Sequence, residues 1–296
     1  MKKLTKILAL VLALALCFAL CACSSSSSGS SASTSSSLEE YKDKDGTLPT
    51  EAPEGTETPA AATDSQYVKD KGVLIVGITD FEPMDYKDDK GEWIGFDADM
   101  AKAFAANLGV DVEFVEIDWD NKALELDGKT IDCVWNGMTL REDVLKAIDC
   151  SKAYCNNAQV VIVPKGEAED LTSIELLSEL SFAVEAGSAG EDMAKQFEFD
   201  YTPVKSQADA LMEVASKTSD AAIIDSLMAA AMVGEGTGYE NLTYTVGLNS
   251  EEYGVGFRKG SDLPEMLNQF FSAAYADGTM IECAETYGVQ AALIEQ

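Results

Sequence analysis

The 296-residue sequence contains 52 Asp and Glu, 21 Lys and Arg and no histidine, which gives a formal net charge of −31. A chain this acidic repels nucleic acid and anionic lipid headgroups, so we expect no nucleic-acid partner. The lack of histidine excludes the Ser-His-Asp triad, the usual zinc sites and the commonest general base. We therefore expect a protein that is not an enzyme and that holds neither a metal nor another cofactor.

The N-terminal segment has the pattern of an export signal. Three lysines among the first six residues precede the apolar run 7–20, which is too short for an ordinary membrane span. The run ends in Leu20-Cys21-Ala22-Cys23, which resembles a lipobox, so Cys23 is the expected lipid anchor. We predict that residues 1–22 are a lipoprotein signal peptide and that the protein is anchored to the outer face of the cell membrane. A plain secretory signal is the alternative.

Residues 23–66 are rich in Ser, Thr, Glu, Ala and Pro and nearly free of large apolar side chains. Such a segment cannot bury enough surface to offset chain entropy, so we expect a disordered tether. Random-coil scaling gives it a reach of roughly 35–40 Å. The remaining chain, roughly 230 residues, suffices for one large or two medium domains.

The first half of this head alternates strands and helices. Strands are expected at 73–78, 110–117 and 131–135, a hairpin tip at 87–92, and helices at 97–109 and 121–127. Asp97 is the expected N-cap of the first of these helices, and Gly109 is its expected stop. This alternation predicts a parallel, doubly wound α/β layout.

The second half repeats the pattern. Strands are expected at 158–163, 182–185, 201–205, 220–224 and 253–257, and helices at 173–180, 191–197, 208–217, 225–233, 264–276 and 280–287. Two similar halves predict two lobes joined by two crossings, near 155–157 and 246–251. We place lobe 1 at 67–156 plus 251–296 and lobe 2 at 157–250.

The stretch 131–141 is the first candidate for a binding site. Its apolar strand ends in Asn136-Gly137, followed by Thr139 and by a helix-like segment that starts at Arg141. Ligands of open α/β sheets bind at the carboxyl ends of strands. We therefore predict that this polar turn forms half of a small-molecule site.

Two further features supply the other half. The turn Glu185-Ala-Gly-Ser-Ala-Gly190 brings small residues and helix N–H groups towards a ligand, although a tight strand-to-helix turn explains its glycines equally well. Asp225 follows an apolar strand, where its carboxylate either caps the next helix or accepts hydrogen bonds from a ligand ammonium. Phe81, Trp119 and Trp135 lie near strand ends and either wall the ligand or pack within a lobe.

Taken in order, the chain resembles the family 3 bacterial extracellular solute-binding proteins, the polar amino-acid receptors of ABC importers. Matching stretches include Leu74-Ile-Val-Gly77, Gly95-Phe-Asp-Ala-Asp99, Gly137-Met-Thr139, Ala183-Val-Glu-Ala-Gly-Ser188 and Tyr253-Gly-Val-Gly-Phe-Arg-Lys-Gly260, and the likeness covers nearly all of 67–290. The resemblance implies a two-lobed, periplasmic-binding-protein-like fold of type II. Each lobe is then a sheet flanked by helices, and a two-crossing hinge closes the lobes on the ligand.

The resemblance also assigns roles to single residues. Phe81 would be the aromatic residue before the loop proline, Asn136, Gly137 and Thr139 the turn that holds the ligand, Ser188, Ala189 and Gly190 the turn of the second lobe, and Asp225 the ammonium-binding acid. The family usually has an arginine five residues after the turn threonine, where this chain has Val144. Arg141 is the nearest substitute for that carboxylate clamp, which is worth ~1.5–3 kcal/mol. Glu185 points to a ligand with a second amino group or a hydroxyl.

We therefore expect a monomeric substrate-binding lipoprotein of an ABC importer. Its partners would be a small polar ligand, such as an amino acid or analogue, the permease subunits, and the membrane through the lipid anchor. A ligand-sensing receptor is the alternative. A dehydratase-like enzyme on the same scaffold, with Glu185 or Glu142 as its acid, is less favoured.

Four cysteines fall within the head, namely Cys133, Cys150, Cys155 and Cys283. Their spacing matches no metal motif. Outside the cell an even set of cysteines can pair. The sequence leaves open a Cys150–Cys155 bridge, a Cys133–Cys150 bridge or free thiols.

Overall fold

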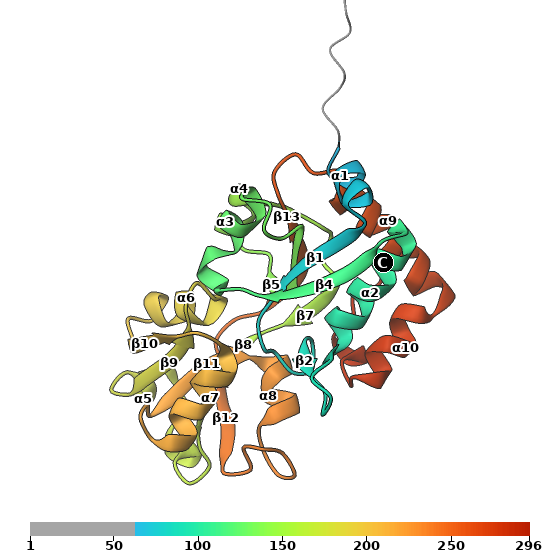
Figure 1. Ribbon diagram of the computed structural model, residues 1–296. Helices are drawn as coiled ribbons and strands as arrows, with labels where there is room; N and C mark the ends of the chain where they lie inside the picture. The colour runs from blue at the N-terminus through green and yellow to red at the C-terminus, as the bar shows by residue number, and fades with distance from the viewer. Residues whose placement is uncertain (1–62) are drawn as a thin grey trace, which may run out of the picture. The chain divides into compact units, whose positions relative to one another are not determined.

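The computed structural model describes residues 63–296 (Figure 1). The expected signal peptide, the Cys23 anchor and nearly all of the expected tether lie outside the described residues. Helix α1 (Asp64–Lys71) begins inside the segment predicted to be a tether, so the limit at 66 is wrong. The Thr63 side chain caps this helix, and the buried Ser65 donates its backbone N–H to the Asp262 carboxylate at 2.8 Å. These contacts hold the start of the helix against the head.

The first sheet has the strand order β4 (Asp111–Glu116), β1 (Val73–Ile78), β5 (Cys133–Thr139), β13 (Glu251–Phe257) and β6 (Asp149–Cys150), and β7 (Cys155–Asn157) also pairs with β13. Strand β1 runs parallel to β4 and β5, whereas β13 runs antiparallel to β5. A small hairpin of β2 (Tyr86–Lys87) and β3 (Trp93–Ile94) lies beside it, as the sequence predicts.

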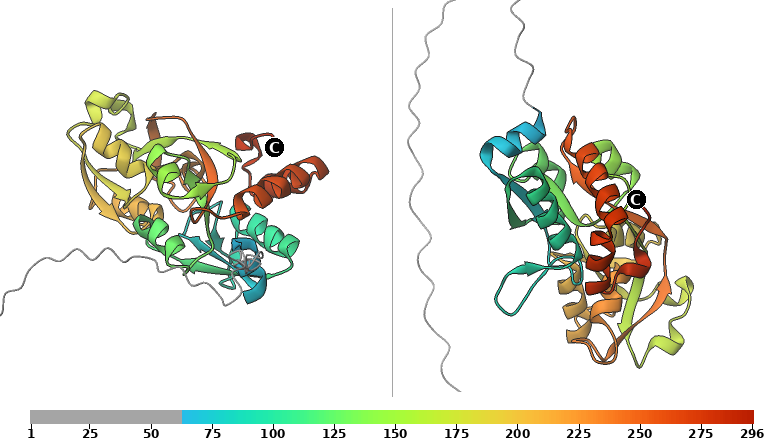
Figure 2. Two further views of the ribbon diagram at one scale, coloured as in Figure 1. Left: turned by 90° about the horizontal axis from the view of Figure 1, so that it is seen from above. Right: turned by 90° about the vertical axis from the view of Figure 1, so that its right-hand side faces the viewer.

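Helices cover both faces of the first sheet. On one face, α2 (Phe96–Leu108), α9 (Leu263–Asp277) and α10 (Thr279–Thr286) contribute to the largest apolar core, and Figure 2 shows α9 and α10 side by side. On the other face, α3 (Lys122–Asp127) and α4 (Glu142–Ala147) pack over a smaller core that includes Val134 and Met138 of β5. Among residues 63–296, no helix is long and apolar enough to cross a membrane.

The second sheet has the order β10 (Asp200–Val204), β9 (Ser181–Glu185), β11 (Ala221–Asp225), β8 (Gln159–Pro164) and β12 (Leu242–Gly247). Three parallel strands are again followed by an antiparallel one, here β8. Its helices are α5 (Ile174–Leu177), α6 (Ala189–Gln196), α7 (Gln207–Ser216) and α8 (Ser226–Met232). This repeated arrangement confirms the predicted α/β fold with two helix-flanked sheets.

The chain passes from the first sheet to the second between β7 and β8, and it returns between β12 and β13. Only Ala158 separates β7 from β8, and residues 248–250 separate β12 from β13. Strand β12, which starts at Leu242, was not predicted from the sequence. Its pairing depends on β8, whose residues lie about eighty positions earlier in the chain. Two short crossings therefore connect two separately built sheets.

Asp97 is not the N-cap of α2, so that prediction is wrong. The helix starts at Phe96 after Gly95, whose φ of +123° favours glycine. Asp97 is instead buried, and its Oδ2 accepts the Gly137 N–H at 2.7 Å and the Tyr154 hydroxyl at 2.7 Å. A capping carboxylate would stay at the surface, whereas this one ties α2 to β5. The predicted stop at Gly109 is confirmed, with φ at +79°.

Strand β5 does not end at residue 135 as the sequence predicts. It continues through Asn136 and Gly137 to Thr139, because β13 supplies backbone partners that include Tyr253 opposite Thr139. The ladder is irregular between Gly254 and Gly256, and Gly137 has a φ of +56°. The polar segment is therefore the irregular end of a strand rather than a turn. All four cysteines within the described residues have free thiols.

Candidate functional site

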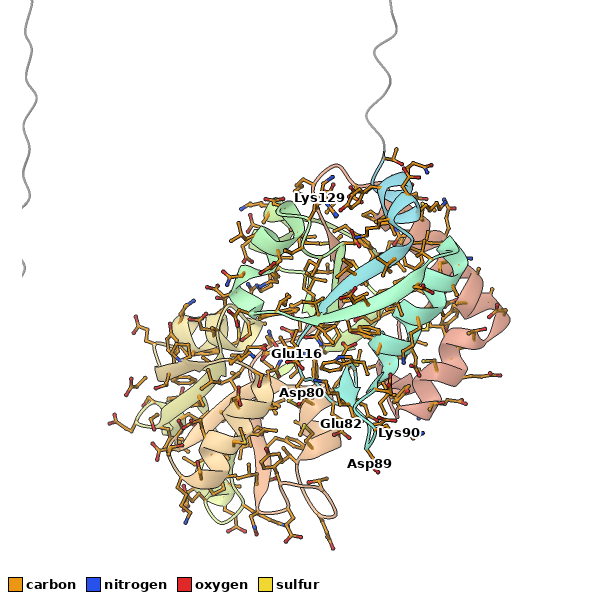
Figure 3. The ribbon with its side chains drawn as sticks, viewed as in Figure 1. Asp80, Glu82, Asp89, Lys90, Glu116 and Lys129 are labelled. Atoms are coloured by element: carbon orange, nitrogen blue, oxygen red, sulfur yellow. The ribbon has the colours of Figure 1, made fainter. Side chains whose placement is uncertain are left out.

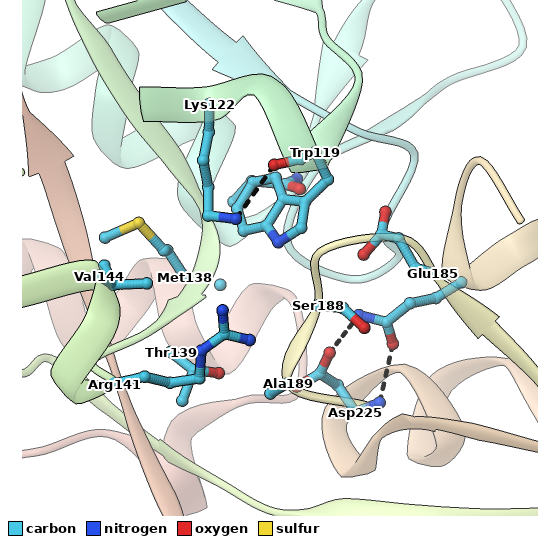
Figure 4. A pocket seen from close by; sticks show the side chains of 13 residues that line it. Trp119, Lys122, Met138, Thr139, Arg141, Val144, Glu185, Ser188, Ala189 and Asp225 are labelled. Carbon is cyan, nitrogen blue, oxygen red and sulfur yellow. Dashed lines mark hydrogen bonds between the residues drawn. The ribbon is translucent and has the colours of Figure 1, made fainter. Parts of the chain in front are cut away.

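A narrow cavity lies where the two sheets face each other (Figure 4), with about 20 Å³ of space for the centres of water-sized molecules. Polar side chains from both sheets converge on it, as they do at small-molecule sites. The first sheet and its helices contribute Trp119, Lys122, Asn136, Gly137, Met138, Thr139, Arg141 and Val144, and the second contributes Glu185, Ser188, Ala189, Gln207 and Asp225. Nine of the twelve residues predicted to bind ligand thus border one cavity. Their contact with a ligand stays a prediction.

The other three predicted residues, Phe81, Trp135 and Gly190, do not line this cavity. Phe81 is buried with its ring edge-on to Tyr253, at a centroid distance of 6.4 Å. Trp135 is fully buried in the core under α2 and α9, 5.5 Å from the ring of Phe271. Gly190 lies against the sheet, because an added Cβ would approach the Ile223 carbonyl oxygen to 2.9 Å. All three pack within a lobe.

Asn136 has a structural role in addition to its place in the cavity wall. Its Oδ1 accepts the Thr79 N–H at 3.1 Å and the Thr79 hydroxyl at 2.8 Å. Its Nδ2 donates to the Thr79 carbonyl at 3.0 Å and to Asp85 at 2.8 Å. A side-chain amide can make four such bonds, and all four are used. The side chain therefore joins the ends of β1 and β5.

Beneath this strand end lie two buried acids, Asp85 and Asp97, each with one oxygen that has no partner among the described residues. Burial raises the pKa of Asp97 to about 7. Burial, and then the nearby charge of Asp97, hold the pKa of Asp85 well above its ordinary value. This pair therefore retains a proton at neutral pH and supports β5 from behind.

Arg141 connects the two lobes. Its Nη2 pairs with Asp143 at 3.0 Å, and its Nη1 pairs with Asp192 of α6 at 3.2 Å. Asp143 lies on the same lobe as the arginine, whereas Asp192 lies on the other. The guanidinium thus borders the cavity with two carboxylates already bound to it.

Four residues that line the cavity were not among those predicted to bind ligand, namely Lys122, Met138, Val144 and Gln207, and Lys122 is the charged one of the four. Its Nζ donates to the carbonyls of Trp119 at 3.0 Å and of Gly187 at 3.1 Å, and the latter belongs to the second lobe. The residue is 8 % exposed, and burial lowers the pKa of the ammonium to about 8. The only sequence signal was a lysine just after Trp119, at the start of a helix that follows a strand end.

Glu185 faces the cavity from the end of β9. Its side chain is buried, and its Oε1 has no hydrogen-bond partner within the described part of the chain. Burial raises the pKa of Glu185 to about 8, although the charge of Lys122 opposes this. Next along the chain, the Ser188 hydroxyl caps α6 by accepting the Glu191 N–H at 3.1 Å. The predicted turn is therefore a capped helix start beside a buried acid.

Asp225 does not cap α8, which was one of its two predicted roles. Its Oδ1 accepts hydrogen bonds from the amides of Asn157 and Gln159 and from the Tyr253 hydroxyl, the last at 2.7 Å. Among the described residues, its Oδ2 accepts a hydrogen bond from the amide of Gln207 only. A carboxylate has about four acceptor sites, so Oδ2 retains room for one more donor.

A second carboxyl adjoins Asp225. Glu251 accepts from the same two amides, of Asn157 at 2.7 Å and of Gln159 at 2.9 Å, and from the Thr139 hydroxyl at 3.0 Å. Burial, and then the charge of Glu251, raise the pKa of Asp225 well above its ordinary value. Asp225 and Glu251 therefore form a carboxyl pair that borders the cavity through Asp225 and lies at the two crossings between the sheets.

Other acids lie away from the cavity. Glu142, the alternative acid of a dehydratase-like site, is exposed and pairs with Lys146 at 2.6 Å. Asp80, Glu82 and Glu116 lie together near the junction of the two sheets (Figure 3). Burial, and then the charge of Glu116, raise the pKa of Asp80. None of these residues lines the cavity.

Two helix-flanked sheets that are joined by two crossings and enclose a polar cavity define a two-lobed binding protein. The chain belongs to the bacterial extracellular solute-binding proteins, family 3, whose family model matches residues 74–290. This match confirms the resemblance found in the sequence, and it supports a solute-binding role on the outer side of the cell.

Similar proteins bind amino acids. The chain is 28 % identical over 232 residues to the L-cystine-binding protein TcyJ of Escherichia coli, covering 74 % of this chain and 84 % of that protein. A mutant of ArgBP from T. maritima superposes with a TM-score of 0.71 at 29 % identity, over 76 % of this chain and 98 % of that one. The ancestral amino acid-binding protein AncCDT-1, a precursor of cyclohexadienyl dehydratase, gives a TM-score of 0.69 at 32 % identity, over 75 % and 98 %.

Proposed function

We propose that this protein is the substrate-binding lipoprotein of an ABC importer and that it captures an amino acid or a related amine-bearing compound between its lobes. One observation carries the proposal. A single cavity brings two cations of the first lobe, Lys122 and Arg141, opposite two carboxyl groups of the second, Glu185 and Asp225. That arrangement of charges suits a small ligand with an anionic group and an amino group.

The amino group of the ligand has two acceptors in this cavity. Glu185 Oε1 has no partner among residues 63–296, and Asp225 Oδ2 accepts a single hydrogen bond. An ammonium between them would satisfy both oxygens and supply a positive charge to two buried acids. Since buried carboxyls without a counter-charge are unfavourable, ligand binding relieves an existing cost.

Ligand capture would use closure of the two lobes. The crossings between the sheets are short, and the contacts that bridge the lobes at the cavity include Lys122 to Gly187 and Arg141 to Asp192. We propose that 67–156 plus 251–296 and 157–250 move as two bodies about the crossings, and that these contacts break on opening. The closed form then presents the ligand to the permease.

The N-terminal sequence completes the proposal. Acylation of Cys23 and a flexible tether would hold a monomeric head above the membrane, within reach of the permease subunits. Replacing Cys23 by alanine should release the protein from the membrane without changing ligand affinity. Metabolic labelling with a clickable fatty acid measures the acylation directly.

The decisive experiment identifies the ligand. The protein is purified under native conditions, its mass is measured with the ligand retained, and the released compound is identified. We expect an amino acid or close analogue, with binding confirmed by calorimetry and weakened by Asp225→Asn and by Glu185→Gln. A co-purified or tightly bound compound without an amino group would overturn the ligand class.

A second candidate function is a dehydratase-like enzyme, because AncCDT-1 is described as the precursor of one and Glu185 is an acid that holds its proton near neutral pH. Incubation of the ligand with a catalytic amount of protein separates the two functions. We expect the ligand to be recovered unchanged, whereas an eliminated product would favour the enzyme. If the protein is instead a sensing receptor, cells that lack its gene should still take up labelled ligand.

A further inference from the structure

We propose that Lys122, rather than Arg141, is the group that binds the carboxylate of the ligand, so that this lysine determines selectivity for carboxylate-bearing compounds. This inference rests on the proposed function, and it assigns recognition of the ligand carboxylate to one residue. The two cations that border the cavity, Lys122 and Arg141, differ in their ion pairing.

Within residues 63–296, the Lys122 ammonium forms no ion pair with a carboxylate. Its Nζ contacts two backbone carbonyls, at 3.0 and 3.1 Å. An ammonium has three donors, so one remains free. The residue is 8 % exposed and borders the cavity. A buried cation that lacks an anion is unfavourable, and an anionic ligand group would remove that cost.

Arg141, in contrast, is already paired. It bonds Asp143 through Nε and Nη2, at 3.2 and 3.0 Å, and Asp192 through Nη1, at 3.2 Å. Two carboxylates already pair with this guanidinium, so Arg141 attracts a further anion weakly. Arg141 therefore serves as an interlobe contact, whereas Lys122 is the cavity cation without an ion-pair partner among residues 63–296.

The surroundings of Lys122 strengthen an ion pair there. Its Nζ lies 4.9 Å from the centroid of the Trp119 ring, and Val144 and Met138 make this part of the wall apolar. In Figure 4 the Lys122 ammonium lies next to Trp119, the Arg141 guanidinium lies below it in the view, and Val144 and Met138 lie to the left of both. Charge pairs are stronger in such a water-poor environment than at the surface. Val144, at the position where the resemblance leads one to expect an arginine, thus leaves room for a lysine from α3.

The other end of the ligand meets Glu185, whose Oε1 lacks a partner among the described residues. The charged and titratable groups that shift the pKa of Lys122 are Arg141 at the start of α4, Asp143 within α4, Glu185 on β9 and Asp120 just before α3. A ligand with a carboxylate at Lys122 and an amino group at Glu185 would span the cavity from one lobe to the other. This geometry selects amino acids over their amides and over simple amines.

Calorimetry on the full-length mature protein tests the inference. The twenty common amino acids and L-cystine are screened first, and the tightest binder is then compared with its own α-carboxamide. We expect Lys122→Met to weaken binding of the acid by roughly ten- to a hundredfold and to leave the amide within about threefold. Lys122→Arg should retain the preference for the acid. Melting curves confirm that each variant is folded.

Arg141→Met is the matched control, because it also removes a cation from the cavity wall. We expect Arg141→Met to weaken binding of the amino acid and of its carboxamide by equal factors. The wild type should lose affinity for the acid above about pH 8, as Lys122 loses its charge, and Lys122→Arg should not. If Lys122→Met keeps the preference and Arg141→Met loses it, the assignment is wrong. If no amino acid binds the wild type, the proposed function fails as well.

Discussion

The ion pair between Arg141 and Asp192 offers a direct test of lobe closure. Arg141 pairs with one carboxylate on its own lobe, Asp143, and with one on the opposite lobe, Asp192. Replacing Asp192 by asparagine removes the charge that crosses the cleft. Replacing Asp143 by asparagine removes an equal charge from the same guanidinium without touching the other lobe. The two variants therefore form a matched pair.

The expected magnitude follows from exposure and distance. The interlobe pair has a separation of 3.2 Å, with side chains that are 18 % and 40 % exposed. Pairs of this kind contribute about 0.2–1 kcal/mol, and the shielded arginine favours the upper end of that range. A loss of about 1 kcal/mol corresponds to roughly a fivefold change in the closing equilibrium. We expect ligand dissociation from Asp192→Asn to be up to about fivefold faster.

Stopped-flow fluorescence measures the dissociation rate, because Trp119 borders the cavity. Asp143→Asn should dissociate at the wild-type rate. Raising the salt concentration to about 0.5 M should reduce the difference between the wild type and Asp192→Asn, since salt screens partly exposed charges. Equal acceleration in both aspartate variants, or none in Asp192→Asn, would refute the role of Arg141 as an interlobe contact.

Three further outcomes follow from the burial of single side chains. Glu185 holds its proton up to a pKa of about 8 when folded against 4.5 ordinarily, so its contribution to stability is complete below pH 4.5 and is lost as the pH rises through 8. In urea titrations, the free energy of unfolding of the wild type should fall between pH 5 and pH 8. In Glu185→Gln this fall should be smaller by about 3 kcal/mol. Trp135→Ala should cost about 3–5 kcal/mol in thermal or urea unfolding, with ligand affinity at the wild-type level, because this ring is fully buried away from the cavity. Trp119→Ala should show lower affinity in calorimetry, because its ring borders the cavity and the Lys122 ammonium; unchanged affinity would contradict this placement.

Local patterns in the sequence predict most of the fold. Strand β1 matches the predicted 73–78, and the helix stop at Gly109 has the expected left-handed conformation. These features depend on residues close together in the chain, such as an apolar run or a glycine after a helix. The order of the strands within each sheet, and the pairing of β12 with β8, depend on residues far apart.

The site was harder to predict, because contacts between distant segments decide how each polar group is used. Asn136 has the residue type and place of a ligand contact, yet Thr79 and Asp85 occupy its four hydrogen-bonding positions. Both Trp119 and Trp135 were predicted to contact the ligand; the acids on either side of Trp119 favour a rim location, but the burial of Trp135 in the core depends on packing between distant segments. Lys122 enters the site through a helix start whose orientation no local pattern encodes.

The site and the crossings share one polar network, and this bears on how binding leads to closure. Asp225 borders the cavity, and its Oδ1 accepts hydrogen bonds from Asn157 of β7 and Tyr253 of β13, the strands at the two crossings. Glu251, at the start of β13, accepts from the same Asn157 amide and from Thr139 of the cavity wall. A ligand ammonium at Asp225 favours the charged carboxylate and so strengthens the bonds that it accepts from both crossing strands. We therefore expect binding energy gained in the cavity to be transmitted, through adjacent hydrogen bonds, to the two crossings about which we propose that the lobes turn.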